Sequence, residues 1–76
     1  MSERRKLSDL GPGQRGKVVE MGGEGEAVKR LMDMGLTRGA GIEVVRRAPL
    51  GDPIEVRVRG FMLTLRRSEA EHITVE

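Results

Sequence analysis

The sequence contains no cysteine, tryptophan or tyrosine, and it has one phenylalanine and one histidine. Without cysteine the chain forms neither disulfides nor thiolate metal sites, which fits a reducing compartment. Its apolar stretches are far shorter than the roughly 20 residues needed to cross a bilayer, and no signal-peptide segment follows Met1. We therefore expect a cytoplasmic protein that does not itself span the membrane.

Catalytic and phosphate-binding motifs are also missing. The only histidine, His72, has no serine-containing elbow to serve as a nucleophile. The glycine-rich stretch 21–25 carries Glu24 where an anion would sit and lacks the Gly-Lys-Ser/Thr ending of a phosphate loop. A metal site would have to combine His72 with the scattered carboxylates of Asp52, Glu69 or Glu71, a pattern typical of an ordinary solvated surface. We predict no enzyme activity, and no catalytic, cofactor-binding or metal-binding residues.

The clearest pattern that is present lies at 54–59, where apolar and charged residues alternate strictly. This period of two indicates a strand with one buried face. If residues 59–60 form a two-residue hairpin turn, the apolar positions 58, 56 and 54 face Phe61, Leu63 and Leu65 on one side. This register assigns Phe61 to the core. Arg59 is a poor first residue for such a turn, so a bulge at Gly60 with a longer loop stays open as an alternative.

A helix is predicted over 24–33, because one side of it would carry the apolar residues Ala27, Val28, Leu31, Met32 and Met34. Gly35 follows, where a left-handed residue would end the helix and let Leu36 contact Leu31 in a Schellman-type cap. We predict that Leu31, Gly35 and Leu36 form a structural unit. Opposite charges four residues apart would add roughly a few tenths of a kcal/mol per pair. These pairs are Glu26 with Arg30 and Lys29 with Asp33.

Shorter patterns fill the rest of the chain. Strands are predicted at 15–21, 42–48 and 72–75; Val45 interrupts the alternation in the second of these, which indicates an edge position or a bulge. The inward face of 15–21 is left open. Single helical turns are predicted around Leu7 and Leu10, and over 68–71 behind a capping box opened by Ser68, with Ala70 facing inward.

Together these elements predict a mainly β fold: a small SH3-like barrel of about five strands with one inserted α-helix. The chain is expected to form a single domain over residues 1–76, with residues 1–6 as a flexible tail.

A small barrel leaves some apolar side chains exposed on its loops and at the margins of its helix, and these are the candidates for binding a partner. The loop 48–53 is stiffened by Pro49 and Pro53, so it can present Leu50 at little cost in ordering entropy. The candidates are Met32, Met34, Arg47, Pro49, Leu50 and Asp52. Arg47 and Asp52 would supply a polar rim, and Met32 or Met34 would extend the contact if the helix end lies nearby. Two alternatives stay open: Leu50 folds back over the open end of the barrel, or the methionines are core filler.

Arginines at 46, 47, 57, 59, 66 and 67 also suggest a nucleic-acid-binding barrel. Such sites usually add stacking aromatics, and the one aromatic is assigned to the core. A solvated outer face, interleaved with Glu43 and Glu55, is the preferred interpretation.

Four segments resemble a known family: LSDLGPGQRG at 7–16, RLMDMGL at 30–36 followed by Gly39, APLGDP at 48–53 and LRRSEA at 65–70. They are similar to ferrous iron transport protein A, FeoA. The resemblance implies an SH3-like barrel and a cytoplasmic accessory role beside FeoB, the membrane ferrous iron permease with a GTP-binding domain. The same barrel also forms the C-terminal domain of some metal-dependent repressors. This chain has no winged-helix domain, so the resemblance favours the standalone family.

We therefore expect a non-enzymatic adaptor that binds and modulates a FeoB-type permease, without a cofactor. The alternatives are a small-barrel nucleic-acid-binding protein and a direct carrier of ferrous iron. Whether the adaptor stimulates GTP hydrolysis, gates the pore or assembles the complex does not follow from the sequence, and neither does its oligomeric state.

Overall fold

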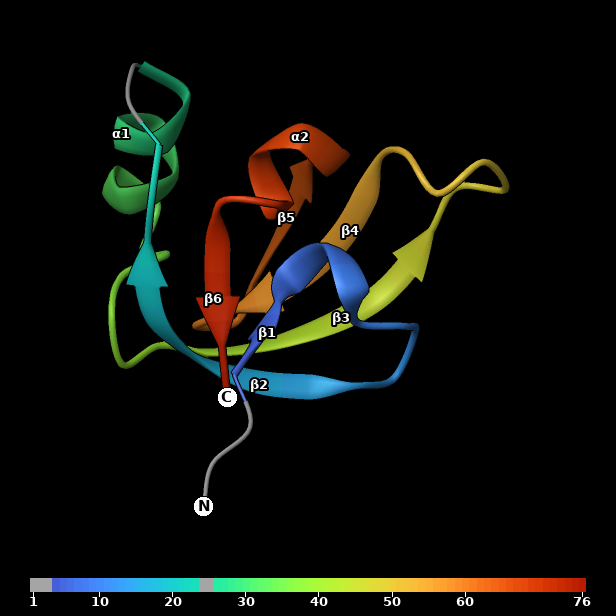
Figure 1. Ribbon diagram of the computed structural model, residues 1–76, viewed down its shortest axis with the longest axis horizontal. Coiled ribbons are helices and arrows are strands. Elements are labelled where there is room, and N and C mark those ends of the chain that lie inside the picture. The colour runs from blue at the N-terminus through green and yellow to red at the C-terminus, as the bar shows by residue number, and fades with distance from the viewer. Residues whose placement is uncertain (1–3, 24–25) are drawn as a thin grey trace.

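The computed structural model describes residues 4–23 and 26–76, which form one antiparallel sheet with short helices around it (Figure 1). The sheet order is β1-β6-β2-β3-β4-β5. The strands are β1 (Arg5–Lys6), β2 (Arg15–Met21), β3 (Gly41–Arg47), β4 (Ile54–Val58), β5 (Phe61–Leu65) and β6 (Ile73–Val75). The helices are the 3-10 turn η1 (Leu7–Asp9), α1 (Glu26–Asp33) and α2 (Arg67–Ala70).

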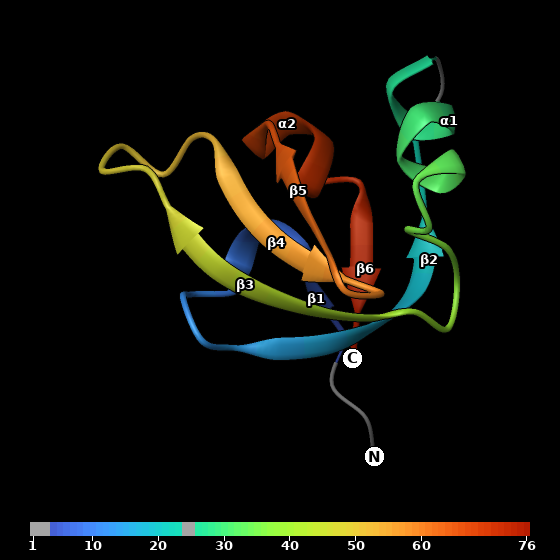
Figure 2. The ribbon, with the colours of Figure 1, turned by 180° about the vertical axis from the view of Figure 1, so that it is seen from behind.

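The sheet curls so that its two ends face each other across the core. In Figure 1 β1 and β6 lie in front of β4 and β5, and in Figure 2 the order is reversed. The buried side chains between them are all apolar among the described residues. They include Leu7 and Leu10 from the N-terminal turn, Ile73 and Val75 from β6, and alternate residues of β3, β4 and β5. The predicted mainly β, SH3-like architecture is confirmed, with six strands in place of five.

The β4–β5 hairpin has the predicted register. Ile54 faces Leu65, Val56 faces Leu63 and Val58 faces Phe61. Both turn residues have positive φ, 50° at Arg59 and 82° at Gly60, as a two-residue type I′ turn requires. The bulged alternative is therefore wrong.

Phe61, however, is not a core residue, since it is 64% exposed. It faces Val58 in the register but lies at the start of β5, beside the hairpin turn, whereas Leu63 and Leu65 on the same face of β5 are buried. The strand alternation predicted the partner of Phe61 correctly but could not show that the core ends before it.

The end of α1 forms the predicted Schellman cap. Gly35 has φ of 101°; its N–H donates to the carbonyl of Met32, and the N–H of Leu36 donates to the carbonyl of Leu31, both at 3.0 Å. Leu31 and Leu36 are fully buried, so the predicted unit is confirmed.

The predicted ion pairs along α1 are wrong. Arg30 pairs instead with Glu69 of α2, at 3.3 Å. Among the described residues, Lys29 and Asp33 are not an ion pair either. Met32 and Met34 are about half exposed rather than buried. The predicted helix start at Glu24 lies outside the described residues.

Several shorter predictions also change. Arg5 and Lys6, which were predicted to belong to a flexible tail, pair instead with Val75 and Thr74 of β6. In β2 it is Val18 that faces the core. The irregularity in β3 is a bulge between Val44 and Arg46, not an edge, because β3 lies between β2 and β4.

The predicted capping box is displaced. Helix α2 begins at Arg67, and the Glu69 carboxylate accepts a hydrogen bond from the backbone N–H of Arg66 at 2.7 Å. The Asp52 carboxylate accepts one from the N–H of Arg67 at 3.1 Å, so the loop before β4 caps this helix in place of Ser68. Ala70 is buried, as predicted.

Candidate partner-binding surfaces

An apolar surface lies where the end of α1 meets the start of β5, and we call it the α1–β5 surface. It consists of Met34, Phe61 and Met62, which are 44%, 64% and 48% exposed. Together with Asp33 and Leu63 they line a hollow of about 290 Å³. Exposed apolar groups gathered around a hollow are typical of a site for a protein partner.

The α1–β5 surface is held together by Arg59. Its Nε donates to the carbonyl of Gly35 at 3.0 Å, and a terminal nitrogen lies 3.4 Å from the Thr37 hydroxyl. Arg59 thereby ties the end of α1 to the β4–β5 turn. Because Met34 precedes Gly35 and Phe61 follows Gly60, this one contact brings the two apolar side chains together.

The free edge of β5 adjoins the same surface. Residues that flank a two-residue hairpin turn bond to each other, so Phe61, Leu63 and Leu65 direct their backbone groups toward β4. The N–H and C=O groups of Met62 and Thr64 then point to the open side of the last strand. An extended segment of a partner could add to the sheet there.

A second exposed apolar group is Leu50, which is 91% exposed at the tip of the loop 48–53. The alternative in which Leu50 covers the open end of the barrel is therefore wrong. The loop is closed by two backbone hydrogen bonds, Gly51 N–H to the Ala48 carbonyl at 2.7 Å and Ala48 N–H to the Pro53 carbonyl at 3.0 Å. Pro49 beside it is also exposed.

Arg47 and Asp52 hold this loop against the rest of the domain. The Arg47 guanidinium donates to the carbonyls of Leu10 at 3.1 Å and Gly51 at 3.5 Å. Asp52 caps α2 through Arg67, as described above. Both predicted rim residues thus bind the domain's own backbone, and their contact with a partner stays a prediction.

The condition under which Met32 or Met34 would extend the Leu50 contact is not met. Figure 1 shows α1 at one end of the long axis and the loop between β3 and β4 at the other, and Figure 2 agrees. The Cα atoms extend 32 Å along this axis. Met32 is exposed but does not line the α1–β5 hollow. Among the described residues, Leu50 and the α1–β5 surface are therefore separate apolar features.

Phe61 and Met62 were missed as surface residues. The signal for Met62 was the run Phe61-Met62-Leu63, because neighbouring residues of a strand face opposite sides, so Met62 had to point away from the core if Leu63 faces it. The run carries no such signal for Phe61, which lies on the same face as Leu63.

Part of the arginine cluster is used within the domain. Arg46 pairs with Glu55 at 2.6 Å, whereas Arg57 and Arg67 form looser ion pairs, 3.9 Å from Glu43 and 3.7 Å from Glu71. The hydrogen bond and the charge of Glu55 raise the pKa of Arg46 above its ordinary value. Since arginine is already protonated near neutral pH, this contact provides no pH switch.

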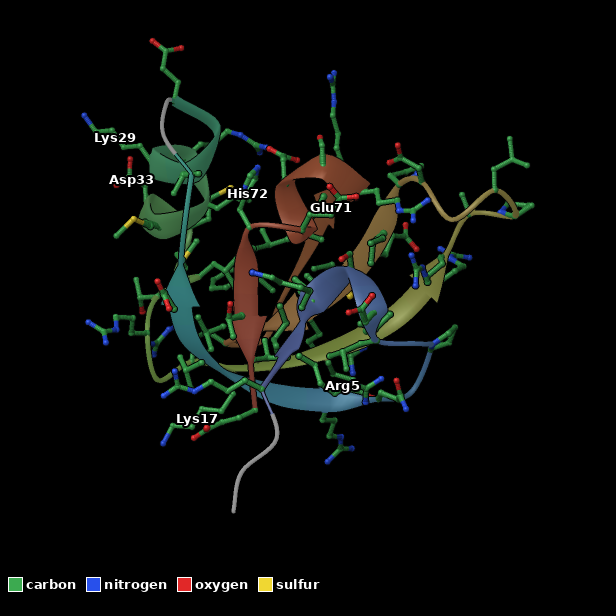
Figure 3. The ribbon with its side chains drawn as sticks, viewed as in Figure 1. Arg5, Lys17, Lys29, Asp33, Glu71 and His72 are labelled. Atoms are coloured by element: carbon green, nitrogen blue, oxygen red, sulfur yellow. The ribbon has the colours of Figure 1, made fainter. Side chains whose placement is uncertain are left out.

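No metal centre or membrane segment is found in the described part of the chain. Within residues 4–23 and 26–76, His and acidic side chains form no group of three that could hold an ion. The helices of these residues are too short or too polar to cross a bilayer. In Figure 3, His72 and Glu71 lie next to each other at the end of α2, on the surface.

The curled antiparallel sheet with its short helices places the molecule among the small SH3-like barrels. The family model described as the FeoA domain matches residues 5–76. The chain therefore belongs to the FeoA family.

Two solved structures show the same fold. The solution structure of the FeoA protein from Chlorobium tepidum shares 54% sequence identity with a TM-score of 0.90, over 95% of this chain and 69% of that one. The crystal structure of Stenotrophomonas maltophilia FeoA complexed with zinc, described as a procaryotic SH3 domain protein, shares 26% identity with a TM-score of 0.82, over 95% and 89%.

A curated relative links the domain to a transporter. The Fe(2+) transport protein A/Fe(2+) transporter FeoB fusion protein of Porphyromonas gingivalis is 39% identical over 71 residues. The match covers 93% of this chain and 8% of that protein. The chain thus corresponds to a small part of the relative's length.

Proposed function

We propose that this chain is a non-enzymatic accessory domain that binds a FeoB-type ferrous iron permease on its cytoplasmic side and modulates iron uptake. The observation that supports this most directly is the fusion protein, in which a 39% identical segment belongs to the same chain as FeoB. Two domains on one chain are held at high local concentration, which favours a pair that works in contact.

The α1–β5 surface is the contact that we propose for the permease. It offers Met34, Phe61 and Met62 around a hollow, next to the unpaired edge of β5. Methionine side chains adapt to an apolar partner and an aromatic ring supplies a rigid anchor. A partner segment that covers them would gain both apolar burial and backbone hydrogen bonds.

A pull-down tests this proposal. The immobilised domain is incubated with detergent-solubilised membranes that contain the permease, under reducing conditions with ferrous iron. We expect the permease to be recovered by the wild type and by Arg46→Ala, a control on another face, and recovery to fall at least about tenfold for Phe61→Ser.

The outcomes distinguish an error in the proposed function from an error in the proposed contact surface. If the wild type recovers no permease, or recovers RNA instead in a manner that added salt weakens steeply, the proposed function is wrong. If Phe61→Ser recovers as much permease as the wild type, only the assignment to the α1–β5 surface is wrong.

Direct transport of iron by the domain needs a separate test, because the Stenotrophomonas maltophilia relative was solved as a zinc complex. With one histidine, no cysteine and no cluster of three ligands among the described residues, we predict that the purified domain does not hold ferrous iron tightly. Anaerobic calorimetry is the measurement. Stoichiometric micromolar binding that His72→Ala abolishes would contradict the prediction.

A further inference from the structure

A groove lies on the outer face of the sheet, where β2, β3 and β4 run side by side. Its volume is about 600 Å³. The pairing places Arg15 beside Glu43, and Glu43 beside Arg57, in a row across the three strands, with Lys17 beside Gly41 in β2 and β3. In Figure 3 Lys17 projects from β2 on the side away from α1 and α2. None of the residues that line the α1–β5 hollow line the groove, although Arg59, which holds the α1–β5 surface together, also lines the groove.

Gly41 keeps this groove open. Gly16, Gly41 and Gly60 all line it. A Cβ atom added at Gly41 would meet nothing within 4 Å, and Gly41 is not among the residues with positive φ. Its backbone therefore does not require glycine, and the missing side chain leaves space that a ligand can enter. We call this site the glycine-floored groove.

The glycine-floored groove is positively charged. It carries two more cations than carboxylates, from Arg15, Lys17, Arg57 and Arg59 against Glu43 and Glu76. The formal net charge of the whole chain is also +2, so this excess equals the charge of the entire molecule.

The carboxylates in the groove leave cationic capacity free. Glu43 lies 3.9 Å from both Arg15 and Arg57, too far to hydrogen-bond to either. Lys17 forms no ion pair or side-chain hydrogen bond with the described residues. A ligand that brings carboxylates would therefore complete these contacts.

We propose that the glycine-floored groove binds an extended acidic segment of a partner protein, with carboxylates at alternate positions. Arg15 and Lys17 are two residues apart on one strand face, a spacing of about 7 Å, and alternate side chains of an extended peptide have the same spacing. No aromatic residue lines the groove, so single-stranded nucleic acid would find no stacking platform there. This proposal does not depend on permease binding.

Fluorescence polarisation with the purified domain tests it. The probe is a labelled peptide of alternating glutamate and serine, and the reference peptide replaces each glutamate with glutamine. We expect the acidic peptide alone to bind, and to bind several times more weakly when ionic strength rises from about 50 mM to about 300 mM. Amide NMR shifts should gather at Gly16, Lys17, Gly41 and Gly60.

Two variants separate charge from shape. Lys17→Glu should weaken binding of the acidic peptide roughly tenfold. Lys29→Glu makes the same charge change on α1, at the top of Figure 3, whereas Lys17 lies at the bottom. It should change binding less than about twofold. Gly41→Val fills the groove while keeping every charge, and a valine suits a strand. It should keep the melting temperature and weaken binding roughly tenfold as well.

Three results overturn the proposal. The first is equal weakening by Lys17→Glu and Lys29→Glu, which would mean a general charge effect. The second is unchanged binding by a folded Gly41→Val. The third is tighter binding of oligouridylate or of anionic phospholipid vesicles than of the peptide, at equal charge concentration. If Gly41→Val fails to fold, the comparison of the two lysine variants decides alone.

Discussion

The loop 48–53 and the α1–β5 surface both expose apolar side chains, but they are built in different ways. Leu50 stands alone at the tip of a loop whose polar groups fasten it to the domain. Met34, Phe61 and Met62 lie directly beside the helix cap and the hairpin turn. At the loop, the residue that is free to touch a partner and the residues that hold the backbone are different residues. At the α1–β5 surface, the contact between Arg59 and Gly35 holds the backbone and also sets the position of the residues that are free to touch a partner.

This difference implies that the tip of the loop can be changed without loss of stability. At the α1–β5 surface the exposed side chains can be changed in the same way, but the Arg59–Gly35 contact that positions them cannot. Substitutions ranked by their expected effect on stability test that view, from the helix cap to the loop tip.

The largest loss is expected for Gly35→Val. A β-branched residue is strained at φ of 101°, and its Cβ would lie 3.0 Å from the Arg59 Cδ. We expect the free energy of unfolding to fall by about 3 kcal/mol, measured by denaturant titration. Gly39→Val is the matched control, because Gly39 has φ of 87° but an added Cβ meets nothing within 4 Å. It should lose about 1–2 kcal/mol from backbone strain alone. An unchanged melting temperature for Gly35→Val would show that the cap does not control stability.

A smaller loss is expected for Arg47→Ala. This substitution removes the bonds to Leu10 and Gly51 that fix the loop 48–53 to the N-terminal turn. We expect a loss of about 1–2 kcal/mol in thermal or denaturant unfolding. The neighbouring Arg46→Ala removes only an exposed ion pair with Glu55 and should cost about 0.5 kcal/mol or less. Equal effects of the two would mean that Arg47 does not anchor the loop.

Local structure could be predicted from the sequence. The alternation at 54–59 and the Arg59-Gly60 turn fixed the hairpin register, and Gly35 marked the end of α1. In each case residues close in the chain determine the outcome, through side-chain period or backbone φ.

Long-range placement could not be predicted. The strand β1 has only two residues, Arg5 and Lys6, and no periodicity. Arg30 forms an ion pair with Glu69, 39 positions away, instead of with Glu26 on its own helix. The distance between Leu50 and Met34 depends on how the whole sheet curls, which no local pattern reports. The sequence therefore predicted that exposed apolar residues such as Met34 and Leu50 would form the candidate surface, but not which residues lie together on it.

Phe61→Ser should affect stability little and binding strongly. Most of the ring is already exposed, so we expect a loss of about 0.5–1 kcal/mol, less than for Arg47→Ala. Phe61→Leu, which keeps an apolar side chain, should retain most permease recovery. A large stability loss for Phe61→Ser would mean that the ring belongs to the core in solution.

The smallest effect on stability is expected for Leu50→Asp. With 91% of Leu50 exposed, the melting curve should stay close to wild type, within about 0.5 kcal/mol. If the stiff loop presents Leu50 to the permease, the same variant lowers permease recovery and iron uptake in cells. Leu50→Ala, which shortens the side chain without adding charge, should show a weaker form of the same loss.

The outcome for Leu50→Asp decides what the loop is for. If the variant melts far earlier, Leu50 is part of the core and the separation of binding from stability fails. If it stays folded and uptake is normal while Phe61→Ser is impaired, the permease contacts the α1–β5 surface alone. If both variants stay folded and both lose recovery, the permease contacts two ends of the domain that lie apart along its 32 Å axis. That result would require one permease surface that spans the length of the domain, two separate contact sites on the permease, or two copies of the domain on it.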